Sequence, residues 1–231
     1  MRYRTLLLAT GVLASGLLVG PNAAEAAPQA ITAHCSWMLP ANLTLRAPRQ
    51  NIWVRKGPDC PKTANTATWM GRTAAGTAIY GAGFGVDGGG WMDVAYTAPC
   101  GQALIWTGWE DGYAYDANNR PVAILRSAKT LTKCGAAVQL TGVRKSTRTT
   151  LTARATYYNE KTGKFVRHHG RVLFQKRDVG SNTWTDLGWA YPNATTGAAS
   201  YTITTNRSRD YRAFVPSGKT VTYAYSLTKR V

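Results

Sequence analysis

The 231-residue sequence is poor in acidic side chains, has only three histidines and contains no uninterrupted run of eighteen apolar residues. Without such a run we expect no permanent transmembrane helix, because about 20 mostly apolar residues are needed to cross the hydrocarbon core. Eleven Asp and Glu residues stand against 28 Lys and Arg, which gives a formal net charge of +17. Because 44% of the residues are hydrophobic and only 17% are charged, the chain can bury a core and is not a disordered polycation.

The first residues have the order of a secretory signal. Two arginines precede an apolar run from Leu6 to about Val19, and a stretch of small residues follows and ends at Ala26. This order is typical of a signal peptide that is removed on export, so we predict a signal at residues 1–26. The mature protein is expected to be secreted, either extracellular or associated with the cell wall.

Cysteine is absent after position 134. An even number of cysteines in an exported chain predicts disulfides, here two, and the sequence leaves all three possible pairings open. The spacings do not form a CxxC pair, so a zinc site is not expected, and we predict no metal and no cofactor. The second half must then be stabilised by packing alone. The four cysteines are Cys35, Cys60, Cys100 and Cys134.

The patterning predicts an all-β protein with two domains. In the first half, glycines and prolines separate apolar runs of four to seven residues, which is the length of strands. In the second half apolar residues alternate, as at Leu151, Ala153 and Ala155, and we expect about seven short antiparallel strands. Residues 28–135 carry 10 basic and 6 acidic side chains, or +4, and residues 136–231 carry 16 and 4, or +12. We therefore place the domains at 31–135 and 136–231.

Four segments of the first half resemble the bacterial SH3-like (SH3b) domain. They are an Asn-Ile-Trp-Val-Arg-Lys-Gly-Pro run at 51–58, a Gly-led strand at 76–81, Trp-Met-Asp-Val at 91–94 and a closing strand into Gly-Trp at 103–109. The resemblance covers about residues 45–113. It implies a small barrel of five to six strands that binds peptidoglycan peptides or other cell-wall ligands.

The second half resembles the bacterial Ig-like sandwich domains of exported actinobacterial proteins, over nearly all of residues 136–231. Segments that carry this resemblance include 138–142, 151–155, 170–177 and 196–203. It implies an antiparallel β-sandwich that serves as a spacer or an adhesive platform, and it carries no functional residue over to this chain.

Aromatic density singles out the first half as the candidate binding module, because six of the eight tryptophans lie there. A barrel of this size can bury about three indoles, so the others are expected at the surface, where rings favour sugars, peptide backbone or cations. Within the resemblance, Arg55 is placed to clamp a carboxylate of a wall peptide. The predicted ligand-binding residues are Asn51, Arg55, Trp106, Trp109 and Tyr113.

The strong positive charge of residues 136–231 favours an anionic partner. At a cell surface the candidates are teichoic acids or the carboxylates of peptidoglycan, and binding would weaken with salt. A solubilising charged face is an equally open interpretation. We expect no specific nucleic-acid partner and a monomeric protein.

The sequence favours binding over catalysis. It contains no G-x-S-x-G elbow, and His168 and His169 are neighbours whose side chains would lie on opposite faces of a strand. We therefore predict no catalytic residue and no enzymatic activity. The alternative is a secreted enzyme or enzyme inhibitor that uses the Gly83–Gly90 loop region.

Overall fold

The computed structural model describes residues 30–85, 89–95 and 99–231, and their regular secondary structure is entirely β-strand. The prediction of an all-β protein is confirmed. Residues Ile31–Val231 form one compact unit, which contains two clusters of buried hydrophobic residues. No helix in this part of the chain is long and apolar enough to span a membrane. The predicted signal peptide, residues 1–26, lies outside the described residues.

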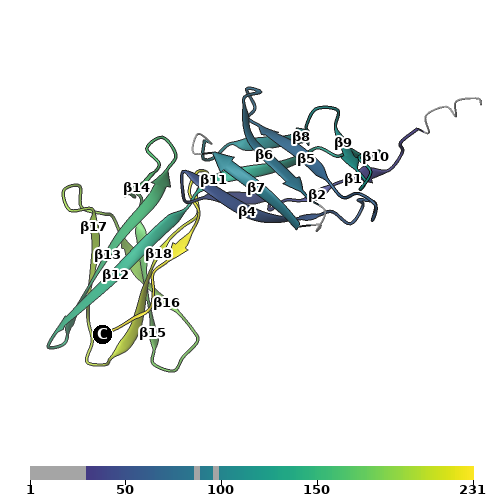
Figure 1. The fold of residues 1–231 in the computed structure, drawn as a ribbon. Helices are drawn as coiled ribbons and strands as arrows, with labels where there is room; N and C mark the ends of the chain where they lie inside the picture. Colours follow the sequence, from purple (N-terminus) through teal and green to yellow (C-terminus); the bar gives the residue numbers. More distant parts are fainter. Residues whose placement is uncertain (1–29, 86–88, 96–98) are drawn as a thin grey trace, which may run out of the picture. The chain divides into compact units, whose positions relative to one another are not determined.

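The first cluster is surrounded by an eight-stranded sheet, in the order β2-β4-β7-β6-β5-β8-β11-β3, and by a three-stranded sheet, β1-β10-β9 (Figure 1). The strands are β1 (His34–Cys35), β2 (Trp37–Met38), β3 (Asn42–Leu45), β4 (Arg49–Lys56), β5 (Ala67–Arg72), β6 (Ala78–Phe84), β7 (Gly89–Ala95), β8 (Ala103–Gly108), β9 (Tyr113–Tyr115), β10 (Pro121–Leu125) and β11 (Ala128–Cys134).

The eight-stranded sheet curls into a barrel because its two edge strands are neighbours in the chain. Strands β2 and β3 lie at opposite ends of the strand order, and only residues 39–41 separate them. That link spans at most about 14 Å, whereas the edges of a flat sheet of eight strands would lie about 33 Å apart. The barrel is therefore larger than the five- to six-stranded one that we expected. The expectation was too small because the resemblance covers about residues 45–113, which contain β4–β8, and the flanking segments add β2, β3 and β11 to the sheet.

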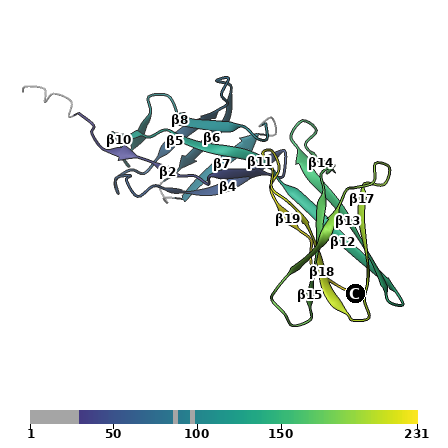
Figure 2. The same cartoon turned by 180° about the vertical axis from the view of Figure 1, so that it is seen from behind.

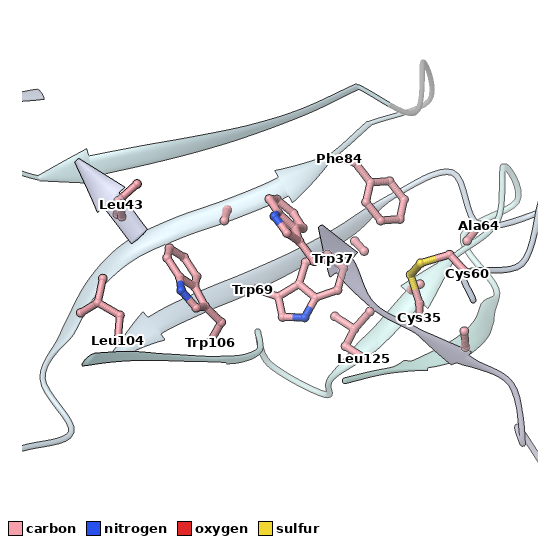
Figure 3. Packing of buried hydrophobic residues seen from close by; sticks show 14 of the residues in the cluster. Cys35, Trp37, Leu43, Cys60, Ala64, Trp69, Phe84, Leu104, Trp106 and Leu125 are labelled. Atoms are coloured by element: carbon pink, nitrogen blue, oxygen red, sulfur yellow. A yellow bond between two sulfur atoms is a disulfide. The ribbon is translucent and has the colours of Figure 1, made fainter. Parts of the chain in front are cut away.

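Among the tryptophans whose side chains the structure describes, three lie in the interior of this barrel. Trp37, Trp69 and Trp106 are 6%, 1% and 0% exposed. Trp37 meets Trp69 edge to face with ring centroids 4.6 Å apart, and Phe84 lies 5.9 Å from Trp69 (Figure 3). Such aromatic packing adds to the free energy of burial, so these rings anchor the first half.

Both predicted disulfides are present, and the structure selects one of the three pairings. Cys35 bonds to Cys60, and Cys100 bonds to Cys134. The first links β1 to the turn after β4, and the second links the turn before β8 to the end of β11. Both lie in the first half, where the sequence places all the cysteines.

The second cluster lies between two sheets, seen from both sides in Figures 1 and 2. One sheet contains β12-β13-β14 with β17 paired to β13, and the other contains β16-β15-β18-β19 with β20 paired to β18. The strands are β12 (Ala136–Lys145), β13 (Arg148–Asn159), β14 (Lys164–Arg167), β15 (Val172–Asp178), β16 (Thr185–Ala190), β17 (Ala198–Thr204), β18 (Arg209–Val215), β19 (Ala224–Tyr225) and β20 (Lys229–Arg230).

The predicted alternation of the second half is confirmed in β13. Leu151, Ala153 and Ala155 are at most 2% exposed and face the opposite sheet. The prediction of about seven short strands is wrong in two respects: nine strands form, and β12 and β13 contain ten and twelve residues. These two strands are long because they form one continuous hairpin of ten residue pairs, from Ala136–Tyr157 to Lys145–Arg148.

Candidate ligand-binding surface

Three exposed side chains form a patch on the outer face of the barrel. Trp53 and Arg55 lie two residues apart on β4 and therefore on the same face, and Trp53 is 81% exposed. Met38 on β2 pairs with Arg55 in the sheet and is 56% exposed. We call Met38, Trp53 and Arg55 the barrel patch. Asn51 precedes Trp53 by two residues on β4, and its side chain lies outside what the structure describes.

The sheet continues from the barrel patch through β7, β6 and β5. The register pairs Trp53 with Trp91 of β7, Trp91 with Gly83 of β6, and Gly83 with Thr68 of β5. At Gly83 an added Cβ would lie 2.7 Å from the Ala67 carbonyl oxygen, so the backbone admits no larger residue there. Gly83 is buried, and the absence of a side chain lets the backbone of β5 approach it closely.

The charge of the patch comes from Arg55 and not from its neighbour. Lys56 occupies the opposite face of β4, where its Nζ donates a hydrogen bond to the Ala64 carbonyl at 2.7 Å and lies 5.5 Å from the Phe84 ring centroid. Burial lowers the pKa of Lys56. Arg55 is therefore the basic side chain at the end of β4 that is open to a ligand.

The end of β4 is fixed by the turn that follows. Asp59 Oδ1 accepts a hydrogen bond from the Ser36 backbone N–H at 3.0 Å, and Arg126 Nε lies 3.5 Å from Asp59 Oδ2. Desolvation opposes ionisation of Asp59, but the hydrogen bonds from Ser36 and the charge of Arg126 outweigh it and lower the pKa of the carboxyl. The disulfide at Cys60 joins the same turn to β1, so the strand that carries the barrel patch is held at this end.

Trp109 and Tyr113 do not join the barrel patch. They flank a turn after β8, in which the Gly112 N–H donates to the Trp109 carbonyl at 2.9 Å, and Trp109 is 42% exposed. Strands β4 and β8 are separated by β7, β6 and β5, which is about 19 Å along the sheet and half of the way around an eight-stranded barrel. The predicted binding residues therefore do not form one surface, because Arg55 lies on one side of the barrel and Trp109 and Tyr113 lie on another.

Trp106 is not a surface residue, which corrects its assignment to the binding set. Its side chain lies among the buried residues of the first cluster (Figure 3) and is 0% exposed. Its Nε1–H donates to Thr130 Oγ1 at 3.1 Å. A Cβ added at Gly71 would lie 2.9 Å from the indole, so the neighbouring strand is fitted closely around the ring. Trp106 alternates inward with Leu104, and an inward position on β8 is the physical reason that it cannot contact a ligand.

Half of the Gly83–Gly90 region belongs to strands β6 and β7. Gly83 belongs to β6, Gly89 and Gly90 belong to β7, and the connection between the two strands is residues 85–88. Residues 86–88 lie outside the described part of the chain.

The groups able to bind a metal do not combine into a usable site in the described part of the chain. Cys100, Cys134 and Glu160 bring three ligand atoms close together, but the two sulfurs share a disulfide and cannot act as thiolates. His168 packs edge-on against Tyr157, with ring centroids 6.3 Å apart, and burial followed by the neighbouring His169 lowers its pKa.

Sequence reasoning missed a second group of exposed rings. In the second half, arginines and aromatic rings alternate over the outer face of the sheet β16-β15-β18-β19. The sequence does offer a signal for them, because Arg212 and Phe214 lie two positions apart on β18 and therefore share one face of the strand. The members are Arg171, Arg177, Trp184, Trp189, Arg212 and Tyr225.

Neither a known protein family nor a curated protein matches this chain. Among solved structures, the chain is similar to the crystal structure of domains A168-A170 from titin, at 10% sequence identity and a TM-score of 0.27. The alignment covers 85% of this chain and 60% of the titin chain, so the chain spans less than two thirds of that structure. At these values the likeness carries no argument about function, and the SH3-like resemblance of the first half stays a prediction.

Proposed function

We propose that this chain is an exported, non-catalytic binding protein that attaches to cell-wall polymers through the barrel patch. The observation that carries the proposal is Trp53, which is 81% exposed on the same face of β4 as Arg55, the residue that pairs with Met38 of β2. An exposed indole gains contact area on sugar rings or peptide backbone at little entropic cost, and a guanidinium pairs with carboxylates through two hydrogen bonds. Peptidoglycan offers all of these groups.

Export is supported by two independent features. The first 26 residues have the order of a secretory signal, and the folded chain contains two disulfides, which persist in oxidising compartments. Attachment outside the cytoplasm is consistent with both.

The proposal is tested by co-sedimentation of the exported chain with purified peptidoglycan at low salt. We expect Trp53→Ala to weaken binding by at least tenfold, because central aromatic residues dominate binding energies, and Arg55→Gln to weaken it less. Trp109→Ala is the matched control, since it removes an exposed indole from the other side of the barrel and should leave binding unchanged. Wild-type binding by Trp53→Ala, or equal losses in both tryptophan variants, would contradict the proposal.

A further inference from the structure

Three aromatic rings at the surface of the second half have arginines against them. Two guanidinium groups lie over the Trp184 ring, with Arg177 Cζ 4.7 Å and Arg212 Cζ 4.2 Å from its centroid. Arg212 also lies 4.2 Å from the Tyr225 ring, so its guanidinium contacts two rings. At another position on the sheet Arg171 lies 4.3 Å from the Trp189 ring. We call these six side chains the arginine ladder: Arg171, Arg177, Trp184, Trp189, Arg212 and Tyr225.

The stacking orders the guanidinium groups before any ligand arrives. Arg212 Nε donates to Gln175 Oε1 at 2.7 Å, and Gln175 Nε2 donates in turn to Asp186 Oδ1 at 2.6 Å. With two rings against it and its Nε–H bound, the Arg212 guanidinium keeps its terminal N–H groups for a ligand. A planar, weakly hydrated guanidinium held in this way suits the bidentate binding of carboxylate or phosphate.

Two charges of the ladder are not balanced. Arg177 pairs with Asp210, with Nε 3.3 Å from Oδ2. In the part of the chain that the structure describes, Arg212 has no carboxylate partner, and Arg171 contacts the Trp189 ring without an ion pair. Because residues 136–231 carry a formal charge of +12, the surrounding potential also favours an anion.

The aromatic members leave room for a neutral part of the same ligand. Trp189 and Tyr225 are 41% and 46% exposed although each has an arginine against it. Phe214 stacks on Tyr225 with ring centroids 4.6 Å apart and extends the apolar surface along the sheet. Cations and exposed ring surface thus alternate, and a ligand that complements them alternates anions with uncharged units.

We propose that the arginine ladder binds a polyanion in which phosphate groups alternate with neutral polyol or sugar units. Phosphates bind the free N–H edges of Arg171 and Arg212, and the neutral units pack against Trp189 and Tyr225. The setting at the cell envelope rests on the proposed function, but the ladder is a separate surface from the barrel patch and takes a different polymer. A ladder that served only to stabilise the sheet would have no preference among anions.

The test measures binding of the exported chain to poly(glycerol phosphate) over a range of salt concentrations. The double variant Arg171→Gln/Arg212→Gln should bind at least tenfold more weakly at moderate salt. The slope of log K against log salt should fall by about two, because two phosphate contacts are lost. The matched control is Arg148→Gln/Arg154→Gln, which removes two exposed arginines from β13 of the other sheet and should change affinity by less than threefold.

Further variants separate the specific site from diffuse charge. Arg212→Lys keeps the charge and loses the planar fork, so it should also weaken binding to poly(glycerol phosphate). Equal losses in the ladder and control variants, or an unchanged Arg212→Lys, would overturn the proposal. Equally strong binding of poly-L-glutamate would overturn the assignment to phosphate. Arg171→Gln alone, which removes only one ring contact, covers the case in which the double variant fails to fold.

Failure of this proposal can be told apart from failure of the proposed function. Trp53→Ala should lose binding to purified peptidoglycan and keep binding to poly(glycerol phosphate), and the ladder variant should show the reverse. Loss of both activities in either variant would contradict the assignment of two surfaces.

Discussion

Tryptophan has two opposite roles in the barrel, and the position of the residue in its strand decides between them. Trp106 is 0% exposed with its indole N–H bonded to Thr130, whereas Trp53 is 81% exposed. The two side chains have the same size and hydrophobicity. Successive residues of a strand face opposite sides of the sheet. A shift of one residue in the pairing register of either strand would therefore move its tryptophan to the other face.

The two tryptophans should therefore differ in their effect on stability. Trp106→Ala should lower the free energy of unfolding by about 3–5 kcal/mol, because it leaves a cavity in a packed interior. Trp53→Ala should change it by no more than about 0.5 kcal/mol, as expected at an exposed site. Urea unfolding of both variants measures the difference, and similar costs would show that the assignment of the two faces is wrong.

Individual site residues were predictable from the sequence only where alternation is clear. Arg55 follows Trp53 by two positions, so both could be placed on one face. Trp106 lies in the apolar run from Ala103 to Trp106, and Ile105 in that run is 44% exposed. A run that is apolar at every position does not reveal which face is inward, so the burial of Trp106 could not be inferred.

At the scale of elements, Asp210 joins three strands of the second sandwich sheet. Its carboxylate on β18 lies 2.8 Å from Arg230 Nε of β20 and 3.3 Å from Arg177 Nε of β15, and its side chain is 4% exposed. The hydrogen bond from Arg230, with a smaller contribution from Arg177, outweighs desolvation and lowers the pKa of Asp210. The folded state thus binds this proton less readily than the unfolded state does.

The difference between the pKa values of Asp210 in the folded and unfolded states determines how the stability of the protein changes with pH. Because the folded pKa lies below the ordinary value of 3.8, the stabilisation by Asp210 is fully present above pH 3.8 and is lost as pH falls through the folded pKa. Asp210→Asn should lower the melting temperature at pH 7 and reduce its decline in acid. Thermal unfolding between pH 7 and pH 2 tests this, with the exposed Asp186→Asn as control, and parallel curves for wild type and Asp210→Asn would contradict it.

The sequence predicts the positions of the strands better than it predicts which strands pair with one another in the sheets. Period-two alternation identifies β13 because every second residue from Thr149 to Ala155 is buried. The parallel pairing of β3 with β11 joins positions 42–45 to positions 131–134. No local pattern indicates a contact over that separation, and without it the number of strands in the barrel could not be known.

For the whole molecule, both covalent links lie in the first half. The cluster of the second half is built without cysteine, from residues such as Leu151, Phe174 and Tyr211. The two disulfides close segments of 25 and 34 residues, and each contributes about 2–4 kcal/mol in a chain-entropy account.

Reduction should therefore affect the two halves unequally. We expect residues 31–135 to lose protection against amide hydrogen exchange when both disulfides are reduced, and residues 136–231 to keep it. Exchange followed by mass spectrometry, with and without reductant, measures each half. Loss of protection in both halves at the same reductant concentration would show that the two clusters unfold as one.

The central claim is that the protein binds a cell-wall polymer and leaves it chemically unchanged. Incubation of the exported chain with purified cell walls tests this most directly when the bound protein and the newly released sugar ends and amino groups are measured in the same sample. We predict that the protein sediments with the cell walls at low salt and that no new sugar ends or amino groups are released. Protein that stays in solution, or walls that release fragments, would contradict the account.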